Sequence, residues 1–363
     1  MTQHPDVLIL GGGVIGLTTA WLLAEAGARV EIVDKGDFGR EASWAGAGIL
    51  VPAYLEHTPT AYDQLRAHSW ALFPSLSQRL RDQTGIDNGY LVCGGLEVFT
   101  AADEESSDEW HGEGITFEEL NGEELQRRFP DLSPAVARAY YLPDMAQLRN
   151  PRHLKALQAA CAARGVSMRP GCPVQRFVCR GSRVESVDTE QGRLTAGRYL
   201  LATGAWSDAL LGPLGWRPGI RPIRGQIALL NTGTTGVRPL VVHGKRYLVP
   251  RGDGRVLVGS TEEDAGFEPL TTAVAITELL QLATSLVPKL AGAAVERCWA
   301  GLRPGSPDGK PLLGAVPGLD NLFVAAGHFR SGIQLSPATA LVMKQLLLGE
   351  NLSISLQDFR LDR

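Results

Sequence analysis

Apolar and polar blocks at the start of the chain predict a strand, a helix and a second strand. Residues 6–10 form a short apolar run, and residues 17–26 form a longer apolar stretch that ends at Gly27. Residues 29–34 contain Val30, Ile32 and Val33 and predict a second strand. Two strands joined by a helix in this way are parallel neighbours in one sheet. The N-terminal pattern therefore predicts a βαβ unit.

The pattern changes further along the chain. It predicts, in order, a helix at 61–83, a helix at 153–164, strands at 166–168 and 174–187, and a buried strand at 199–204. From Ile223, short apolar runs separated by turns predict an antiparallel sheet, with a hairpin turn at 251–254. The pattern then predicts a helix at 271–290, a strand at 321–326 and a helix at 336–348. We expect an α/β fold, α+β overall, in which a mostly antiparallel part interrupts the first domain.

Three glycines between the first strand and the helix have the spacing of a dinucleotide-binding turn. Gly11 permits the tight turn, Gly13 lets a pyrophosphate approach the backbone, and Gly16 lets the helix pack closely on the strand. The helix N-terminus adds free N–H groups for phosphate oxygens. Asp34, at the end of the second strand, can accept hydrogen bonds from ribose hydroxyls, which favours FAD or NAD over NADP. The alternative is a turn that serves packing alone, and the glycines do not choose between FAD and NAD.

Composition argues against several other classes of protein. The 363 residues carry a formal net charge of -4, which offers no basic surface for nucleic acid or an anionic membrane. No apolar stretch approaches the roughly 18 residues of a membrane span. The five cysteines form no C-x-x-C pair and no zinc-like cluster with histidine. We therefore expect reduced thiols, no metal site and a cytoplasmic location.

Three later segments resemble FAD-dependent amine oxidoreductases of the D-amino acid oxidase type. They are residues 41–49, residues 198–207 and residues 325–332. Within that family the chain is similar over its whole length to the bacterial glycine oxidases, most densely at 247–251, 258–262, 299–305, 308–311 and 327–332.

The resemblance implies a Rossmann-type FAD-binding domain of the glutathione reductase/D-amino acid oxidase kind. This discontinuous domain would comprise residues 1–84, 141–222 and 302–363. A mostly antiparallel substrate-binding domain, residues 85–140 and 223–301, would interrupt it.

The resemblance also implies the residues that contact FAD. They are Gly11, Gly13, Val14, Ile15, Gly16, Asp34, Lys35, Ala42, Ser43, Ala47, Gly48, Ile49, Val174, Thr203, Gly204, Trp206, Gly327, His328, Phe329, Arg330, Ser331, Gly332, Ile333 and Gln334. Some relatives hold the flavin through a cysteine in the arginine-proline segment, where this chain has Gly301 and the nearby Cys298 is offset by three residues. We therefore expect non-covalent FAD.

Three residues are implied to bind the substrate. Arg303 resembles the arginine that holds the substrate carboxylate, because a guanidinium fork matches both oxygens at once. Tyr247 resembles a phenol that adds a hydrogen bond, and Arg330 resembles a second arginine at the pocket edge. Taken alone, Arg303 could equally be a charge on a loop, and Tyr247 a core residue. Arg330 could donate hydrogen bonds to backbone carbonyls. No protein base is required because the flavin carries the hydride step, so His328 is not assigned as an acid or a base.

The implied activity is FAD-dependent oxidation of glycine or a similar small amino acid. Hydride would pass from Cα to the flavin, the imine would hydrolyse to an oxo acid, and O₂ would reoxidise the flavin to give H₂O₂. The imine would also serve thiazole synthesis for thiamine. Alternatives are a D-amino acid or sarcosine oxidase, a dehydrogenase that uses another acceptor, a tRNA-modifying enzyme and a non-catalytic flavin-binding protein. We expect a homodimer or homotetramer without nucleic-acid or membrane partners, and leave open whether Glu262 lines the pocket.

Overall fold

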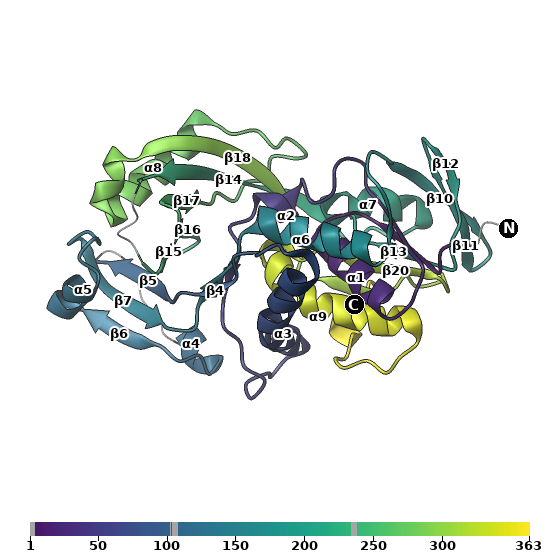
Figure 1. Cartoon of the computed structure of the whole chain (residues 1–363), viewed down its shortest axis with the longest axis horizontal. Helices are drawn as coiled ribbons and strands as arrows, with labels where there is room; N and C mark the ends of the chain where they lie inside the picture. Colours follow the sequence, from purple (N-terminus) through teal and green to yellow (C-terminus); the bar gives the residue numbers. More distant parts are fainter. Residues whose placement is uncertain (1–3, 102, 104–107, 234–237) are drawn as a thin grey trace.

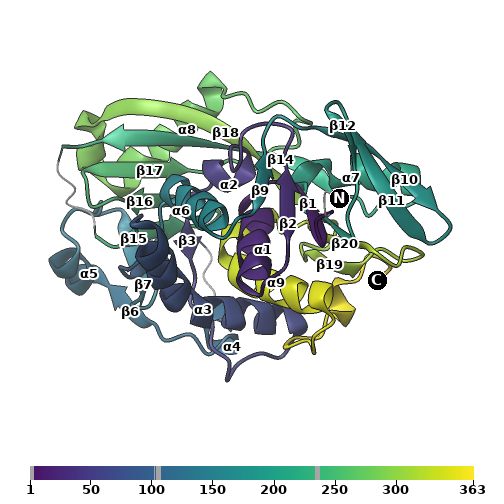
Figure 2. The same ribbon diagram turned by 45° about the vertical axis from the view of Figure 1, so that its right-hand side comes forward.

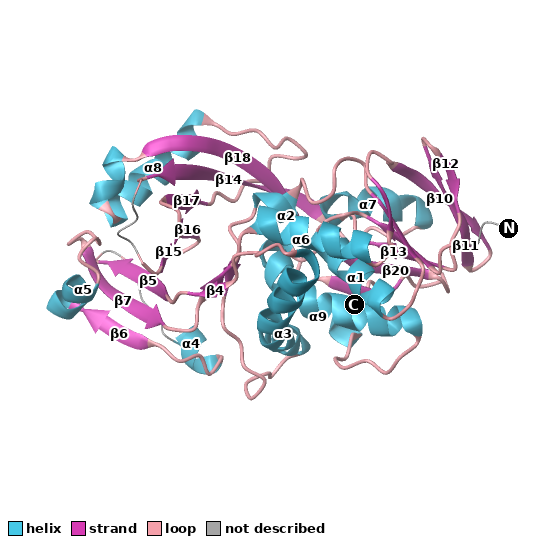
Figure 3. Ribbon diagram, in the orientation of Figure 1, coloured by secondary structure: helices cyan, strands magenta, loops and turns pink. Residues whose placement is uncertain are grey.

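The computed structural model describes residues 4–101, 103, 108–233 and 238–363. Figure 1 shows an elongated molecule with a helix-rich part, which contains α1, α3 and α9, and a strand-rich part, which contains β5–β7 and β14–β18. Figure 3 makes the same division visible by secondary structure. The helices are α1 Val14–Glu25, α2 Ala42–Ala45, α3 Ala61–Thr84, α4 Asp108–Gly112, α5 Gly122–Arg128, α6 Asn150–Ala163, α7 Ser207–Leu211, α8 Ala273–Leu286 and α9 Gly332–Leu348.

A six-stranded sheet forms the centre of the helix-rich part. Its spatial order is β19 (Leu312–Ala315), β20 (Leu322–Ala326), β13 (Arg198–Leu201), β1 (Val7–Leu10), β2 (Val30–Val33) and β9 (Ser167–Arg169). All neighbours are parallel except β19 and β20. The predicted βαβ unit is β1–α1–β2, which Figure 2 shows from a second direction.

Both faces of this sheet are covered. Val7 and Ile9 of β1 pack into one core with residues of α1, α3, α6 and α9. Leu8 and Leu10 face the other way, into a core shared with a three-stranded sheet of β10 (Val174–Arg180), β11 (Arg183–Thr189) and β12 (Gly192–Leu194). A strand buried on both faces has no polar alternation, which explains the uninterrupted Val-Leu-Ile-Leu run.

An eight-stranded sheet forms the strand-rich part. Its order is β18 (Ala294–Gly305), β14 (Arg221–Asn231), β17 (Arg255–Gly259), β16 (Arg246–Pro250), β15 (Leu240–His243), β5 (Gly95–Thr100), β7 (Val136–Leu142) and β6 (Glu118–Asn121). Neighbours are antiparallel except β15 and β5. A small sheet of β3 (Ile49–Leu50), β8 (Ala146–Gln147) and β4 (Leu91–Val92) completes the fold. The predicted fold class is confirmed.

The length of β14, predicted only as a short strand at 226–230, and the whole of β18 were missed by the sequence pattern. The sequence pattern from Ile223 suggested short strands, whereas β14 has 11 residues and β18 has 12. In Figure 1 they run side by side from the strand-rich part to the centre of the molecule. The antiparallel pairing extends to Arg221 and Gly305, past both predicted domain boundaries. The domain bounds themselves stay a prediction.

The predicted start of the last helix is wrong. We expected the helix to begin at Ser336, but α9 begins at Gly332 and contains Pro337. Pro337 has no N–H for the carbonyl of Ile333, and the Ser336 hydroxyl donates to that oxygen at 2.8 Å instead. The helix therefore continues through the proline, and its N-terminus lies four residues earlier than expected. Similarly, the predicted 271–290 helix ends at Leu286 as α8, followed by a 3-10 turn at Pro288–Gly292.

None of the helices in the described ranges combines the length and apolar character that a membrane span needs. Within the same ranges, no group of three or more His, Cys, Asp or Glu side chains is placed to hold a metal ion.

Candidate active site

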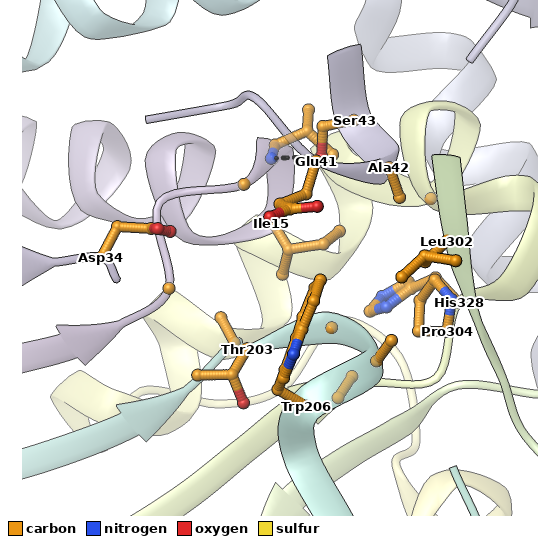
Figure 4. A pocket seen from close by; sticks show the side chains of 18 of the residues that line it. Ile15, Asp34, Glu41, Ala42, Ser43, Thr203, Trp206, Leu302, Pro304 and His328 are labelled. Carbon is orange, nitrogen blue, oxygen red and sulfur yellow. Dashed lines mark hydrogen bonds between the residues drawn. The ribbon is translucent and has the colours of Figure 1, made fainter. Parts of the chain in front are cut away.

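A cavity of about 330 Å³ crosses the carboxyl ends of β1, β2, β13 and β20. We call it the cofactor cavity. Figure 4 shows Asp34 at one end and His328, Leu302 and Pro304 at the other, with Ile15 and Trp206 between them. A long cavity at this edge of a parallel sheet is the usual site of a dinucleotide.

The glycine turn lets α1 begin against the end of β1. Gly11 has a φ of 109°, and a Cβ there would lie 2.4 Å from the carbonyl oxygen of Ala202. A Cβ on Gly16 would lie 2.0 Å from the carbonyl oxygen of Gly11. Neither position can therefore hold a larger residue without moving backbone. The Ser43 hydroxyl accepts a hydrogen bond from the N–H of Val14 at 3.0 Å, drawn in Figure 4.

Asp34 closes one end of the cofactor cavity. Its two carboxylate oxygens accept hydrogen bonds from the N–H groups of Gly12 at 2.7 Å and Gly36 at 2.9 Å. Burial raises the pKa of Asp34, although both backbone hydrogen bonds oppose this. Each oxygen of a carboxylate can accept more than one hydrogen bond, so acceptor capacity remains for two hydroxyl groups.

The other end is formed by the turn between β20 and α9. Phe329 lies in the left-handed region with a φ of 47°, which is uncommon for a residue with a side chain and is found mainly at functional sites. His328 is buried, and its Nε2 lies 3.1 Å from the Thr339 hydroxyl. Burial lowers the pKa of His328 to about 3, so the imidazole is neutral. The N-terminus of α9 follows directly, with Gly332 and Ile333 lining the cavity.

These features fit FAD. The tight turn from Gly11 to Gly16 would bring a pyrophosphate to the N-terminus of α1, and the carboxylate of Asp34 would lie at the ribose end. The second helix N-terminus, that of α9, lies at the opposite end, where its positive dipole favours an electron-rich ring system.

A second cavity of about 290 Å³ opens beside the first, and we call it the substrate cavity. Strands of the eight-stranded sheet contribute Glu97, Gly225, Tyr247 and Gly301 to its wall. Arg303, Arg330, Ala42, Gly46 and Ile333 line both cavities. A molecule in the substrate cavity would therefore meet the α9 end of the cofactor.

Arg303 lies at the junction of the two cavities. Its Nη1 donates to the carbonyl oxygen of Thr261 at 3.1 Å, and its Nη2 donates to the Ser260 hydroxyl at 2.6 Å. Within the described part of the chain, no carboxylate forms an ion pair with it. Burial lowers the pKa of Arg303, and the nearby Arg330 lowers it further, whereas Tyr247 and the more distant carboxylate of Glu262 raise it. A largely enclosed cation without an anionic partner is the arrangement expected of a site for an anionic ligand.

Gly225 and Gly259 make room for the side chains of Arg303 and Tyr247. A Cβ on Gly225 would lie 2.2 Å from both Nη1 and Nη2 of Arg303, so the guanidinium lies directly over the glycine. A Cβ on Gly259 would lie 2.8 Å from the Tyr247 ring. Gly301 is paired with Gly225 across β14 and β18, and a Cβ there would lie 2.4 Å from that of Ala45.

Arg330 differs from Arg303 because it has an anionic partner. Its Nε donates to Glu262 Oε2 at 2.8 Å, and its Nη2 donates to the same oxygen. Glu262 also accepts from Lys245 at 3.4 Å. Although burial raises the pKa of Glu262, Arg330 and Lys245 lower it overall, so the carboxylate is charged.

Comparisons with known proteins identify the family. The family model described as FAD dependent oxidoreductase, DAO, matches residues 6–346. The chain belongs to this family. It is 39% identical to the glycine oxidase of Pseudomonas putida over 346 residues, which cover 95% of this chain and 94% of that protein. It is 37% identical to the bifunctional protein ThiO/ThiG of Synechocystis, covering 97% of this chain and 53% of that protein. The crystal structure of glycine oxidase from Geobacillus kaustophilus superposes with a TM-score of 0.93 at 33% identity, covering 100% of this chain and 99% of that one.

Membership of the FAD-dependent oxidoreductase family confirms the predicted resemblance, the enzyme class and FAD as the cofactor. Of the described cysteines, Cys172 lines the cofactor cavity, beside Asp34. Gly301 lines the substrate cavity, and the non-covalent attachment of FAD stays a prediction.

The structure gathers most of the predicted site residues of this FAD-dependent enzyme. Tyr247 lines the substrate cavity, and Arg303 and Arg330 line both cavities. The predicted cofactor residues line the cofactor cavity except Ala47, Gly48, Ile49, Ser331 and Gln334, which line the substrate cavity, and Gly16 and Gly327, which line neither. The roles of all these residues stay predictions.

Sequence reasoning missed several residues of the substrate cavity. Glu97 accepts a hydrogen bond from Trp110 Nε1 at 2.5 Å, and both line the wall. An acid inside the apolar run of β5 was a signal for Glu97, whereas nothing in the local sequence marks Trp110. Gly225 was missed because its importance depends on the position of Arg303 on the neighbouring strand.

Proposed function

We propose that the protein oxidises glycine, with sarcosine as a second substrate. Glycine, water and O₂ would give glyoxylate, ammonia and H₂O₂. The observation that carries the proposal is Arg303, a cation without an anionic partner in the described residues, at the junction of the two cavities. The glycine oxidases at 39% and 33% identity over nearly the whole chain support the same substrate.

In this proposal Arg303 holds the substrate carboxylate through two parallel hydrogen bonds. Ser260 and Thr261 hold the guanidinium in place from the protein side, and Gly225 lets it lie flat. Tyr247 adds a hydrogen bond from its hydroxyl to the same carboxylate. With the carboxylate fixed, Cα of the substrate would face the end of the cofactor cavity formed by residues 328–330, 332 and 333.

When bound, FAD supplies the hydride acceptor and the route for electrons to O₂. The chain supplies orientation and electrostatics. His328 is neutral and interacts with Thr339, which suits a positioning role for its turn. The substrate ammonium loses its proton to water before Cα–H cleavage, so no side chain is assigned as a base.

Sarcosine is the second candidate because of the size of the substrate cavity. A volume of about 290 Å³ exceeds what glycine fills, and it leaves room for an N-methyl group. Glycine and sarcosine have the same carboxylate and Cα, so both suit Arg303.

The wider biological role is also a proposal. The similarity to a bifunctional ThiO/ThiG protein supports a role in making the thiazole of thiamine. We further propose a homodimer or homotetramer in the cytoplasm, with residues 1–84, 141–222 and 302–363 binding FAD and residues 85–140 and 223–301 covering the substrate.

The test is to purify the protein, record its absorption spectrum and measure peroxide production with glycine and sarcosine. We expect a yellow protein that releases free FAD on denaturation and produces H₂O₂ with both substrates. A yellow protein that produces no H₂O₂, but reduces a quinone or dye with glycine, would instead indicate a dehydrogenase.

A further inference from the structure

The charged residues of the substrate cavity are unevenly paired. Its wall contains four cations, Lys245, Arg246, Arg303 and Arg330, and the carboxylate of Glu97. Arg246 pairs with Glu278 at 3.2 Å, and Arg330 and Lys245 share Glu262. Arg303 is the cation of this wall for which the described residues provide no carboxylate. The cavity is therefore built to take one negative charge at Arg303.

Glu262 is the anionic partner of Arg330. The side chains of Arg330 and Glu262 are 32% and 31% exposed, so their ion pair is only partly screened by water. Both Nε and Nη2 of Arg330 donate to one oxygen of Glu262, so Glu262 takes one of the two donor pairs through which a guanidinium binds a carboxylate. Lys245 is 75% exposed and lies farther from Glu262, so it adds less.

A substrate with a second carboxylate would need a cation that is available. Arg330 is the cation beside Arg303 at the junction of the cavities, because both residues line both cavities. The Nε and Nη2 side of its guanidinium already donates to Glu262, and the charge of Glu262 would repel an incoming carboxylate. A neutral N-substituent meets neither obstacle.

We propose that Glu262 is a specificity-determining residue that restricts the substrate cavity to monocarboxylates by occupying Arg330. This rests on the proposed function and adds to it the exclusion of N-substituents that carry a carboxylate. Glu262 contacts the wall residue Arg330 and not the reacting atoms, so it acts on substrate choice through that arginine.

The first test compares two N-substituted glycines. Sarcosine carries a neutral methyl group on nitrogen, and iminodiacetate carries a carboxymethyl group. In Glu262→Gln, which keeps the shape of the side chain and removes its charge, we expect kcat/KM for iminodiacetate relative to sarcosine to rise about tenfold. Adding Arg330→Met to Glu262→Gln should return the ratio to the wild-type value.

A second readout does not depend on turnover. The dissociation constants of acetate and malonate are measured by the change each causes in the flavin absorption spectrum of the holoenzyme. The affinity for malonate relative to acetate should rise about tenfold in Glu262→Gln and fall back in the double variant. Glu262→Leu provides a second neutral variant, and FAD content reports whether each protein is folded.

Glu296→Gln is the matched control because Glu296 pairs with the exposed Arg255 on the same sheet and lines neither cavity. It removes the same charge and should leave both ratios unchanged. The inference would be overturned if the kcat/KM and affinity ratios of Glu262→Gln and Glu262→Leu stayed within about twofold of the wild-type values. It would also be overturned if the ratios of the double variant, which lacks Arg330, stayed as high as those of Glu262→Gln. Failure of the wild type to oxidise glycine or sarcosine would contradict the proposed function, while the affinities for acetate and malonate would still decide the role of Glu262.

Discussion

The guanidinium of Arg303 lies against the backbone of Gly225, where an added Cβ would approach both terminal nitrogens to 2.2 Å. The two residues belong to neighbouring strands, β18 and β14. A glycine at this point is therefore a condition for the position of the arginine, and the position of the arginine determines where a substrate carboxylate can lie.

Gly225→Ala should displace Arg303 and lower kcat/KM for glycine by about ten- to a hundredfold, because a misplacement of about 1 Å can cost that much. FAD content should stay near that of the wild type. Gly252→Ala is the control, since a Cβ there meets no atom within 4 Å. Steady-state peroxide production measures both variants, and equal activity of the two would show that Arg303 tolerates the methyl group without consequence.

Asp34→Ala should weaken FAD retention. The loss of hydrogen bonds to a charged acceptor costs about 1.5–3 kcal/mol, which corresponds to about a ten- to hundredfold rise in the dissociation constant. The carboxylate also anchors the N–H groups of Gly12 and Gly36, so the turn loosens as well. Fluorescence of released FAD after dialysis measures the effect. The exposed Asp37, three residues further along, provides the control Asp37→Ala, and equal FAD loss in both variants would contradict the assignment.

The local parts of the fold could be predicted from the sequence, and the long-range contacts could not. The β1–α1–β2 unit and the cofactor end near Asp34 follow from residues close together in the chain. In contrast, the ion pair of Arg330 with Glu262 joins residues 68 positions apart. The contact of Arg303 with Gly225 depends on the register of β14 against β18, which no local pattern contains. The start of α9 was misplaced because the Ser336 hydroxyl compensates for the proline.

His153 predicts a pH dependence of stability. It is fully buried, and burial lowers its pKa to about 4, whereas the unfolded chain has the ordinary value near 6.5. Between these values the unfolded state binds the proton and the folded state does not, so the free energy of unfolding decreases as the pH falls below about 6.5. The lowered pKa of His328 acts in the same direction.

Replacing His153 by Gln should make the melting temperature fall less between about pH 7 and pH 5 than in the wild type. Differential scanning fluorimetry of both proteins over this range measures the slope. His68→Gln, on a partly exposed histidine of α3, is the control and should keep the wild-type slope. An unchanged slope in the His153 variant would show that other groups set the pH dependence.

The most direct measurement of the central claim is kcat/KM for glycine in Arg303→Ala, alongside the flavin spectrum. Removing one member of an enclosed charge pair costs about 2–5 kcal/mol, so we expect a loss of about thirtyfold to several thousandfold with FAD content near wild type. Arg303→Lys keeps the charge without the planar fork, so its kcat/KM should lie between those of the wild type and of Arg303→Ala. Near-normal peroxide production by an FAD-loaded Arg303→Ala variant would contradict the claim that Arg303 holds the substrate carboxylate.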